Sequence, residues 1–257
     1  MKVDFGEHAF KKLSYLAGTD EERLSDLNTA FRDPEVRAIY TTGGGKGSYR
    51  IADGIDFDAV RRDPKFLIGF SDINILHLCL WKHCRLISVH GALYNPAGPL
   101  GKTEECLRQV LMTAEPIIVR AREEEATSTL TTTGRAAGRL LGGNYTMMAT
   151  AAGWALPSLA GAILLIEGNG EWQGEIDRRL TMLRKAGHFD GLAGIAVGQF
   201  AGFKFNVVEL LRDHLDRLGV PILGGLPLGH GDEPLSVPIG AMATFDTVSR
   251  ELVVRPD

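Results

Sequence analysis

Cysteine is scarce in this sequence, and no pattern of metal-binding residues stands out. The 257 residues include only Cys79, Cys84 and Cys106, an odd number that does not make a disulfide framework. Their spacing fits no zinc pattern, and neither a His-Glu-x-x-His segment nor a close His/Cys/Asp group occurs. We therefore expect reduced thiols, a cytoplasmic location, no metal and no cofactor.

Long apolar runs and clusters of basic residues are also missing. The longest apolar stretches, near 73–80 and 151–166, are too short or too interrupted by Gly, Pro and Ser to span a bilayer. The first residues contain no apolar run of signal-peptide length. The net charge is −4 and basic residues are scattered, so we expect neither a membrane nor a nucleic acid partner. A hydrophobic content of 44% is enough for a packed core.

Several glycine-rich segments look like nucleotide motifs but fail on spacing. Residues 98–103 end like a phosphate loop, yet Pro96 stands where its first glycine is required. Residues 168–170 lack the third glycine of a dinucleotide fingerprint, because Gln173 takes that place. Residues 43–48 follow a predicted strand but match neither pattern. The sequence therefore does not favour a nucleotide site.

The first half of the chain alternates between strand-like and helix-like segments. Apolar segments predict strands at 2–5, 36–42, 66–70 and 86–89. Apolar spacing predicts helices at 20–31 and 72–84, the first capped by Thr19 with Glu22 completing a capping box. Such alternation is typical of a parallel, doubly wound sheet.

The second half begins after a segment of different character. Residues 98–130 are predicted to form a crossover, with a helix near 104–114. A glycine-rich turn is predicted at 142–144. Strands follow at 162–166, 192–197 and 221–223, helices at 175–185 and 207–218, and short β segments at 235–239, 241–245 and 251–254. We predict an α/β fold of two lobes, a doubly wound N-terminal lobe at 1–97 and a C-terminal α/β lobe with a β-rich end at 131–257.

Ser71 lies where the predicted strand 66–70 runs directly into a helix. A hydroxyl on such a turn is presented at the top of the sheet, beside the free N–H groups of the helix start, including that of Asp72. Those groups suit a tetrahedral oxyanion, as in a nucleophile elbow. From the turn alone, however, a helix N-cap is the commoner role for Ser71 or Asp72.

A serine nucleophile needs a base and a group that orients the base. Among seven histidines, His90 ends a predicted strand and His230 lies in a loop flanked by Gly229 and Gly231. Glu167 ends the strongest predicted strand of the second half, where open α/β sheets place functional groups. Glu171, four residues on, is a competing acid.

Several short blocks, in order along the chain, resemble the LD-carboxypeptidase family of serine peptidases, which includes muramoyltetrapeptide carboxypeptidases and microcin-immunity hydrolases. The blocks are Gly44-Gly45-Lys46-Gly47, Ile68-Gly69-Phe70-Ser71-Asp72-Ile73, Val89-His90-Gly91, Gly142-Gly143-Asn144, Leu165-Ile166-Glu167 with Glu175-Ile176-Asp177-Arg178, Gly229-His230 and Pro238-Ile239-Gly240. The resemblance implies a catalytic triad of Ser71, Glu167 and His230 at the junction of the lobes. Glu167 is preferred to Glu171 because it stands at the strand end.

The resemblance also implies an oxyanion hole of backbone N–H groups. It assigns these to Asp72 and to Gly44 and Gly45 of the glycine loop. Two departures from the family are visible. Gly43 and Lys46 replace an Arg and a Tyr that are frequent in that loop. The family also begins with a further strand and helix before the segment matching 2–5, so we expect a truncated first sheet without its central strand.

The function that the resemblance implies is removal of a terminal D-amino acid, D-alanine, from a murein tetrapeptide during peptidoglycan recycling. The family also implies a homodimer acting on a peptide or muropeptide. One alternative is a self-immunity hydrolase of peptide–nucleotide antibiotics, with Trp154 or Trp172 stacking on the base, although packing is the commoner role of tryptophan. The other is a truncated, inactive binding protein.

Overall fold

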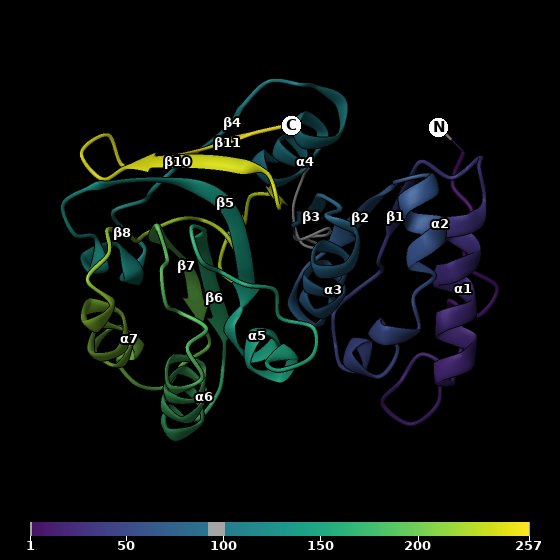
Figure 1. The fold of residues 1–257 in the computed structure, drawn as a ribbon, viewed down its shortest axis with the longest axis horizontal. Helices are drawn as coiled ribbons and strands as arrows, with labels where there is room; N and C mark the ends of the chain where they lie inside the picture. Colours follow the sequence, from purple (N-terminus) through teal and green to yellow (C-terminus); the bar gives the residue numbers. More distant parts are fainter. Residues whose placement is uncertain (1, 92–100, 257) are drawn as a thin grey trace.

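The computed structural model describes residues 2–91 and 101–256, and Figure 1 shows two sheets side by side. The helices are α1 (Asp20–Arg32), α2 (Phe57–Arg62), α3 (Asn74–Cys84), α4 (Lys102–Met112), α5 (Tyr145–Ala151), α6 (Gln173–Lys185) and α7 (Val207–Leu215). The strands are β1 (Ala38–Tyr40), β2 (Phe66–Gly69), β3 (Ser88–His90), β4 (Ile117–Arg120), β5 (Arg135–Asn144), β6 (Ile163–Asn169), β7 (Gly194–Ala201), β8 (Ile222–Leu223), β9 (Val237–Ile239), β10 (Met242–Asp246) and β11 (Glu251–Arg255). The mixed α/β architecture of the protein confirms the predicted fold class.

The N-terminal sheet has the order β1-β2-β3-β9. Strands β1, β2 and β3 are parallel, as predicted, and β9 returns from near the end of the chain to pair antiparallel with β3. Helix α1 starts at the predicted capping box, where Thr19 accepts from the Glu22 N–H and Glu22 accepts from the Thr19 N–H. The sheet edge therefore depends on a segment far away in sequence.

The strand predicted at 2–5 is wrong. These residues form no strand, and Val3 and Phe5 are about two-thirds exposed. The Phe5 ring packs instead against Phe10, with centroids 5.1 Å apart. The segment is apolar enough to suggest a strand, but among the described residues no strand pairs with it.

The C-terminal sheet has the order β4-β11-β10-β5-β6-β7-β8. Strands β5 to β8 are parallel, whereas β4, β11, β10 and β5 pair antiparallel and form the β-rich end. Helices α5, α6 and α7 lie side by side along the parallel part (Figure 1). Strand β4 lies within the segment predicted as a crossover and was not expected; the proposed lobe boundaries stay a prediction.

The turn predicted at 142–144 is wrong, because these residues end the ten-residue strand β5. Gly142 and Gly143 have φ angles of 112° and 126°, which favour glycine. A Cβ on Gly143 would lie 2.5 Å from the Asn74 amide nitrogen. The glycines therefore serve close packing between lobes rather than a change of direction.

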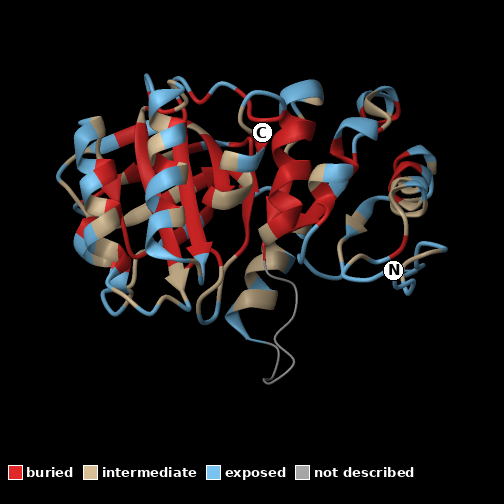
Figure 2. Ribbon diagram, turned by 90° about the horizontal axis from the view of Figure 1, so that it is seen from below, coloured by how far each residue is buried: buried red, intermediate tan, exposed pale blue. Residues whose placement is uncertain are grey.

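Helix α3 occupies the centre of the molecule. All of its residues from Asn74 to Trp81 are buried, and it packs against α2, β5 and α5. Figure 2 shows the buried residues concentrated in α3 and in the strands of the C-terminal sheet. The turn that carries Ser71 therefore leads into a helix that both lobes cover. In the described part of the chain, no helix is long and apolar enough to cross a membrane.

Candidate active site

Ser71 lies on a tight turn between β2 and α3, at the start of a short 3-10 helix (Ser71–Ile73). Its φ of 63° is in the left-handed region, which costs a non-glycine residue about 1–3 kcal/mol and is found at functional sites. Gly69 makes the turn possible, since a Cβ there would lie 2.4 Å from the Thr41 hydroxyl. The backbone is thus held in the strained form that presents a serine hydroxyl outward.

The structure brings Ser71, His230 and Glu167 into one hydrogen-bonded chain. The His230 Nε2 lies 3.0 Å from the Ser71 Oγ, and the His230 Nδ1 lies 2.6 Å from the Glu167 Oε2. A carboxylate can only accept, so the hydrogen lies on Nδ1 and the Nε2 lone pair faces the hydroxyl. Glu167 is fully buried and the His230 side chain is 13% exposed.

The end of β6 and the loop at Gly229 place Glu167 and His230. Glu167 lies near the end of β6, paired in register with Asn144 at the end of β5. Gly229, with φ of 120°, leads into His230, and a Cβ there would lie 2.7 Å from the Glu167 Oε2. Glycine at 229 is therefore what allows the histidine loop to lie against the carboxylate.

Gln199 holds the histidine loop and was not identified from the sequence. It is 1% exposed; its side-chain oxygen accepts from the Gly231 N–H at 3.1 Å, and its amide donates to the Asp232 carbonyl at 2.9 Å. The Phe70 ring packs against the His230 ring, with centroids 4.9 Å apart. A polar residue inside the apolar strand β7 is the only sequence signal that could have pointed to Gln199.

Asn74 joins the two lobes close to Ser71. Its buried side-chain amide donates to the Gly142 carbonyl across the lobe junction at 2.7 Å. Ser71 lies three residues before Asn74, and Gly142 lies two residues before the partner of Glu167. This bond therefore fixes the Ser71 turn relative to β5 and to its neighbour β6, which carries Glu167.

The glycine loop lies directly over Ser71. A Cβ on Gly44 would come within 2.8 Å of the Ser71 Cβ and 3.5 Å of the Asp72 backbone nitrogen. The buried Asp72 carboxylate accepts from the Ser48 N–H at 2.8 Å and ties the loop to the turn. Gly44 and Asp72 thus lie beside the serine, whereas Gly45 lines the neighbouring cleft. The oxyanion role of Asp72, Gly44 and Gly45 stays a prediction.

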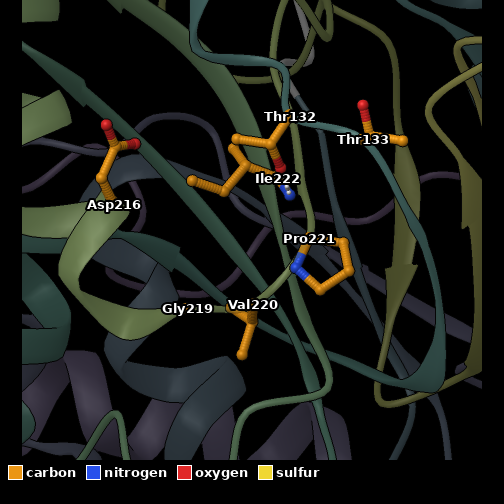
Figure 3. Close-up of a pocket in the computed structure, with 7 residues that line it drawn as sticks. All are labelled: Thr132, Thr133, Asp216, Gly219, Val220, Pro221 and Ile222. Carbon is orange, nitrogen blue, oxygen red and sulfur yellow. Dashed lines mark hydrogen bonds between the residues drawn. The ribbon is translucent and has the colours of Figure 1, made fainter.

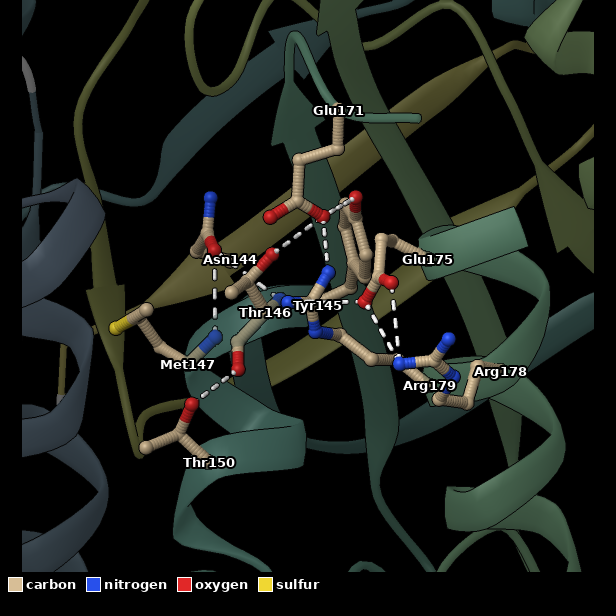
Figure 4. A network of polar contacts seen from close by, with 9 residues as sticks. All are labelled: Asn144, Tyr145, Thr146, Met147, Thr150, Glu171, Glu175, Arg178 and Arg179. Carbon is tan, nitrogen blue, oxygen red and sulfur yellow. Dashed lines mark hydrogen bonds and ion pairs between the residues drawn. The ribbon is translucent and has the colours of Figure 1, made fainter. Parts of the chain in front are cut away.

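Glu171 belongs to a separate network, which Figure 4 shows. Its Oε2 accepts from the hydroxyls of Tyr145 and Thr146 and pairs with the Arg179 guanidinium at 2.5 Å. Burial raises the pKa of Tyr145, and the hydrogen bond to Glu171 raises it further. The structure thus brings Glu167, and not Glu171, against His230.

His90 and His77 lie deep in the N-terminal lobe. Burial lowers the pKa of His90 to about 3 and that of His77 to about 4. The His77 Nε2 bonds the Gly69 carbonyl at 2.9 Å, whereas neither ring nitrogen of His90 has a partner in the described structure. His90 therefore stays neutral near pH 7 and forms no hydrogen bond with the Ser71 hydroxyl.

Other candidate features lie apart from the serine. A pocket of about 340 Å³ is lined by residues that precede β5 and β8 and by the turn after α7, among them Thr132, Asp216 and Pro221 (Figure 3). The Trp154 indole donates to the Thr150 carbonyl, and Trp172 is 86% exposed. The described residues contain no group of three or more His, Cys, Asp or Glu side chains suited to a metal ion.

Comparison with known proteins gives a consistent result. The model of the LD-carboxypeptidase N-terminal domain matches residues 1–91, and that of the C-terminal domain matches 137–245. The chain is 33% identical to a "probable murein peptide carboxypeptidase" of Bacillus subtilis, over 99% of this chain and 82% of the relative. It is 30% identical to a murein tetrapeptide carboxypeptidase of Pseudomonas aeruginosa, over 95% and 84%.

A solved structure supports the fold. The microcin C7 self-immunity protein MccF, known from Escherichia coli, superposes with a TM-score of 0.86 at 24% identity, over 98% of this chain and 85% of that one. At this identity the likeness concerns the fold alone. The two domain matches and the Bacillus relative lead to one conclusion: the chain belongs to the LD-carboxypeptidase family of serine peptidases.

Proposed function

We propose that this enzyme releases the terminal D-amino acid, D-alanine, from murein tetrapeptides, with Ser71 as nucleophile, His230 as base and Glu167 as the group that orients it. The observation that carries the proposal is the continuous chain of contacts from Glu167 Oε2 through His230 to Ser71 Oγ, at 2.6 and 3.0 Å. The names of the Bacillus and Pseudomonas relatives support the substrate class. Peptidoglycan recycling in the cytoplasm and a homodimer remain part of this proposal.

In the proposed reaction, the Ser71 oxygen attacks the carbonyl carbon of the L,D amide while His230 Nε2 takes the hydroxyl proton. Glu167 stabilises the imidazolium, and the N–H groups of Asp72 and the glycine loop bind the oxyanion. The carbon–nitrogen bond then breaks as His230 returns its proton to the leaving amine. Water hydrolyses the acyl-enzyme by the same proton route and restores the Ser71 hydroxyl.

The direct test is D-alanine release from a murein tetrapeptide by the wild-type enzyme and by Ser71→Ala. We expect Ser71→Ala to lower kcat at least about a thousandfold, because the acyl-enzyme cannot form. Unfolding curves serve as the control that the variant is folded. Release by Ser71→Ala at the wild-type rate would contradict the proposal.

The glycine loop offers a matched pair of variants. Gly44→Ala should lower kcat by about a hundredfold or more, because its Cβ would push the loop away from Ser71 and disturb an oxyanion donor. Gly43→Ala is the control, since a Cβ there meets nothing within 4 Å. Equal losses in the two variants would show that the loop does not act through its contact with Ser71.

The self-immunity reaction is the second candidate, favoured by one observation. Trp172 directly follows Glu171 and is 86% exposed, so its ring is free within this chain to stack on a nucleobase. Trp154 suits this role less, because its indole is hydrogen-bonded to its own chain. The two candidates are separated by comparing the hydrolysis of a peptide–nucleotide conjugate with that of the tetrapeptide. If the enzyme acts on murein, Trp172→Ala should leave tetrapeptide hydrolysis nearly unchanged.

A further inference from the structure

A cleft of about 680 Å³ opens beside the glycine loop. It is lined by Tyr15, Gly45, Lys46 and Tyr49. Gly44, the residue before this lining segment, is the one that packs against Ser71. The cleft therefore adjoins the nucleophile, and the reaction as proposed leaves its side chains without a role.

Lys46 is an exposed cation in this cleft with no carboxylate partner. Two other basic residues of this region, Arg23 and Arg50, are both paired with Asp20, at 2.5 and 2.7 Å. In residues 2–91 and 101–256, no carboxylate oxygen lies within 4.0 Å of the Lys46 ammonium. Its positive charge is thus available to a ligand.

The loop holds Lys46 at a fixed place relative to the serine. On the C-terminal side of Lys46, the Arg23 guanidinium donates to the Gly47 carbonyl at 3.2 Å, and the Ser48 N–H donates to the Asp72 carboxylate at 2.8 Å. On its N-terminal side, Gly44 lies against Ser71. With both sides of the loop anchored, less freedom is lost when Lys46 binds a ligand.

The two tyrosines suit the same kind of ligand. Burial raises the pKa of Tyr49, and a hydrogen bond to Tyr15 adds to this, so the two phenol groups lie together and Tyr49 is uncharged at neutral pH. A neutral phenol donates a hydrogen bond to an anion without repelling it. The cleft thus combines one cation with phenol donors.

We propose that this cleft binds the free C-terminal carboxylate of the substrate, with the Lys46 ammonium as its ion-pair partner and Tyr15 and Tyr49 as its walls. The inference rests on the proposed function and deepens it. An enzyme that removes one terminal residue has to distinguish a chain end from a chain interior, and a cation next to the nucleophile makes that distinction. Lys46 then acts as a specificity-determining residue.

Binding measurements test the carboxylate site, and hydrolysis measurements test the proposed function. Binding is measured by calorimetry on Ser71→Ala, with a murein tetrapeptide and with the same peptide carrying a C-terminal amide. We expect the free acid to bind about 10–100-fold more tightly than the amide, and this preference to disappear in Ser71→Ala with Lys46→Met. Lys46→Arg should restore most of it. Lys185→Met, which removes an exposed lysine at the end of α6, is the matched control and should preserve it.

The outcomes distinguish the inference from the proposed function. If the wild-type enzyme releases D-alanine but Lys46→Met leaves the preference for acid over amide intact, the inference is wrong and the function stands. If the preference depends on Lys46 but the wild type releases no D-alanine, the carboxylate site stands and the function is wrong. An equal loss of affinity for the acid and the amide peptide in Lys46→Met would also overturn the inference, since it would indicate a general disturbance of the loop.

Discussion

Glu167→Gln should lower kcat for D-alanine release about 10³- to 10⁴-fold while the protein stays folded. The His230 Nδ1 lies 2.6 Å from the Glu167 Oε2, and that contact selects the tautomer whose Nε2 faces Ser71. A glutamine of the same shape can offer an N–H to Nδ1 instead, which favours the wrong tautomer. It also removes the negative charge that stabilises the imidazolium.

Glu171→Gln is the matched control four residues away. Its carboxylate contacts Tyr145, Thr146 and Arg179 but not His230, so we expect kcat to change by less than about tenfold. The same substitution should cost about 1–3 kcal/mol of stability through the weakened ion pair with Arg179. Steady-state rates and unfolding curves check both. A larger loss of kcat in Glu171→Gln than in Glu167→Gln would reverse the assignment of the acid.

Stability should fall steeply between pH 6.5 and pH 5. In the folded state the pKa of His77 is about 4 and that of His90 about 3, both lowered by burial from 6.5. Each folded-state pKa lies below the unfolded value, so the unfolded chain binds the extra protons. The stabilising contribution is complete well above pH 6.5 and is lost as the pH falls from there toward the folded-state values. Two histidines give a loss of roughly 3 kcal/mol between pH 6.5 and pH 5.

Urea unfolding at several pH values measures this loss, and His90→Leu isolates half of it. Leucine removes two ring nitrogens that have no partner in the described structure, so stability at pH 7.5 should change little. The slope below pH 6.5 should fall from about 2.7 to about 1.4 kcal/mol per pH unit. The carboxyls of Asp56 and Asp63 do not contribute to this slope, since their pKa values are lowered and they titrate below pH 5. An unchanged slope in His90→Leu would contradict the prediction.

The sequence was most informative where the structure is local. The capping box at Thr19 and the strand–turn–helix around Ser71 depend on residues next to one another, and both were predicted. The relation of Ser71 to His230 spans 159 positions, and only the resemblance to a family suggested it. Local pattern alone favoured a helix cap at this serine.

The features that escaped prediction depend on contacts between distant segments. The end of strand β5 is rich in glycine, and the sequence predicts a turn at 142–144, because nothing local shows that Asn74 packs on Gly143. Strand β9 joins the N-terminal sheet from near the end of the chain, which no periodicity can reveal. Gln199 shows its role only once β7 lies beside the His230 loop.

The proposal that Ser71 is the nucleophile has one most direct measurement. A serine-directed phosphonate is added in steps, and each sample is divided between mass analysis of the labelled residue and an assay of D-alanine release from a murein tetrapeptide. We expect the label on Ser71 alone, with activity falling in proportion to the labelled fraction, and no labelling in His230→Ala on the same time scale. Full D-alanine release from protein completely labelled at Ser71, or loss of activity with the label on another residue, would contradict the assignment.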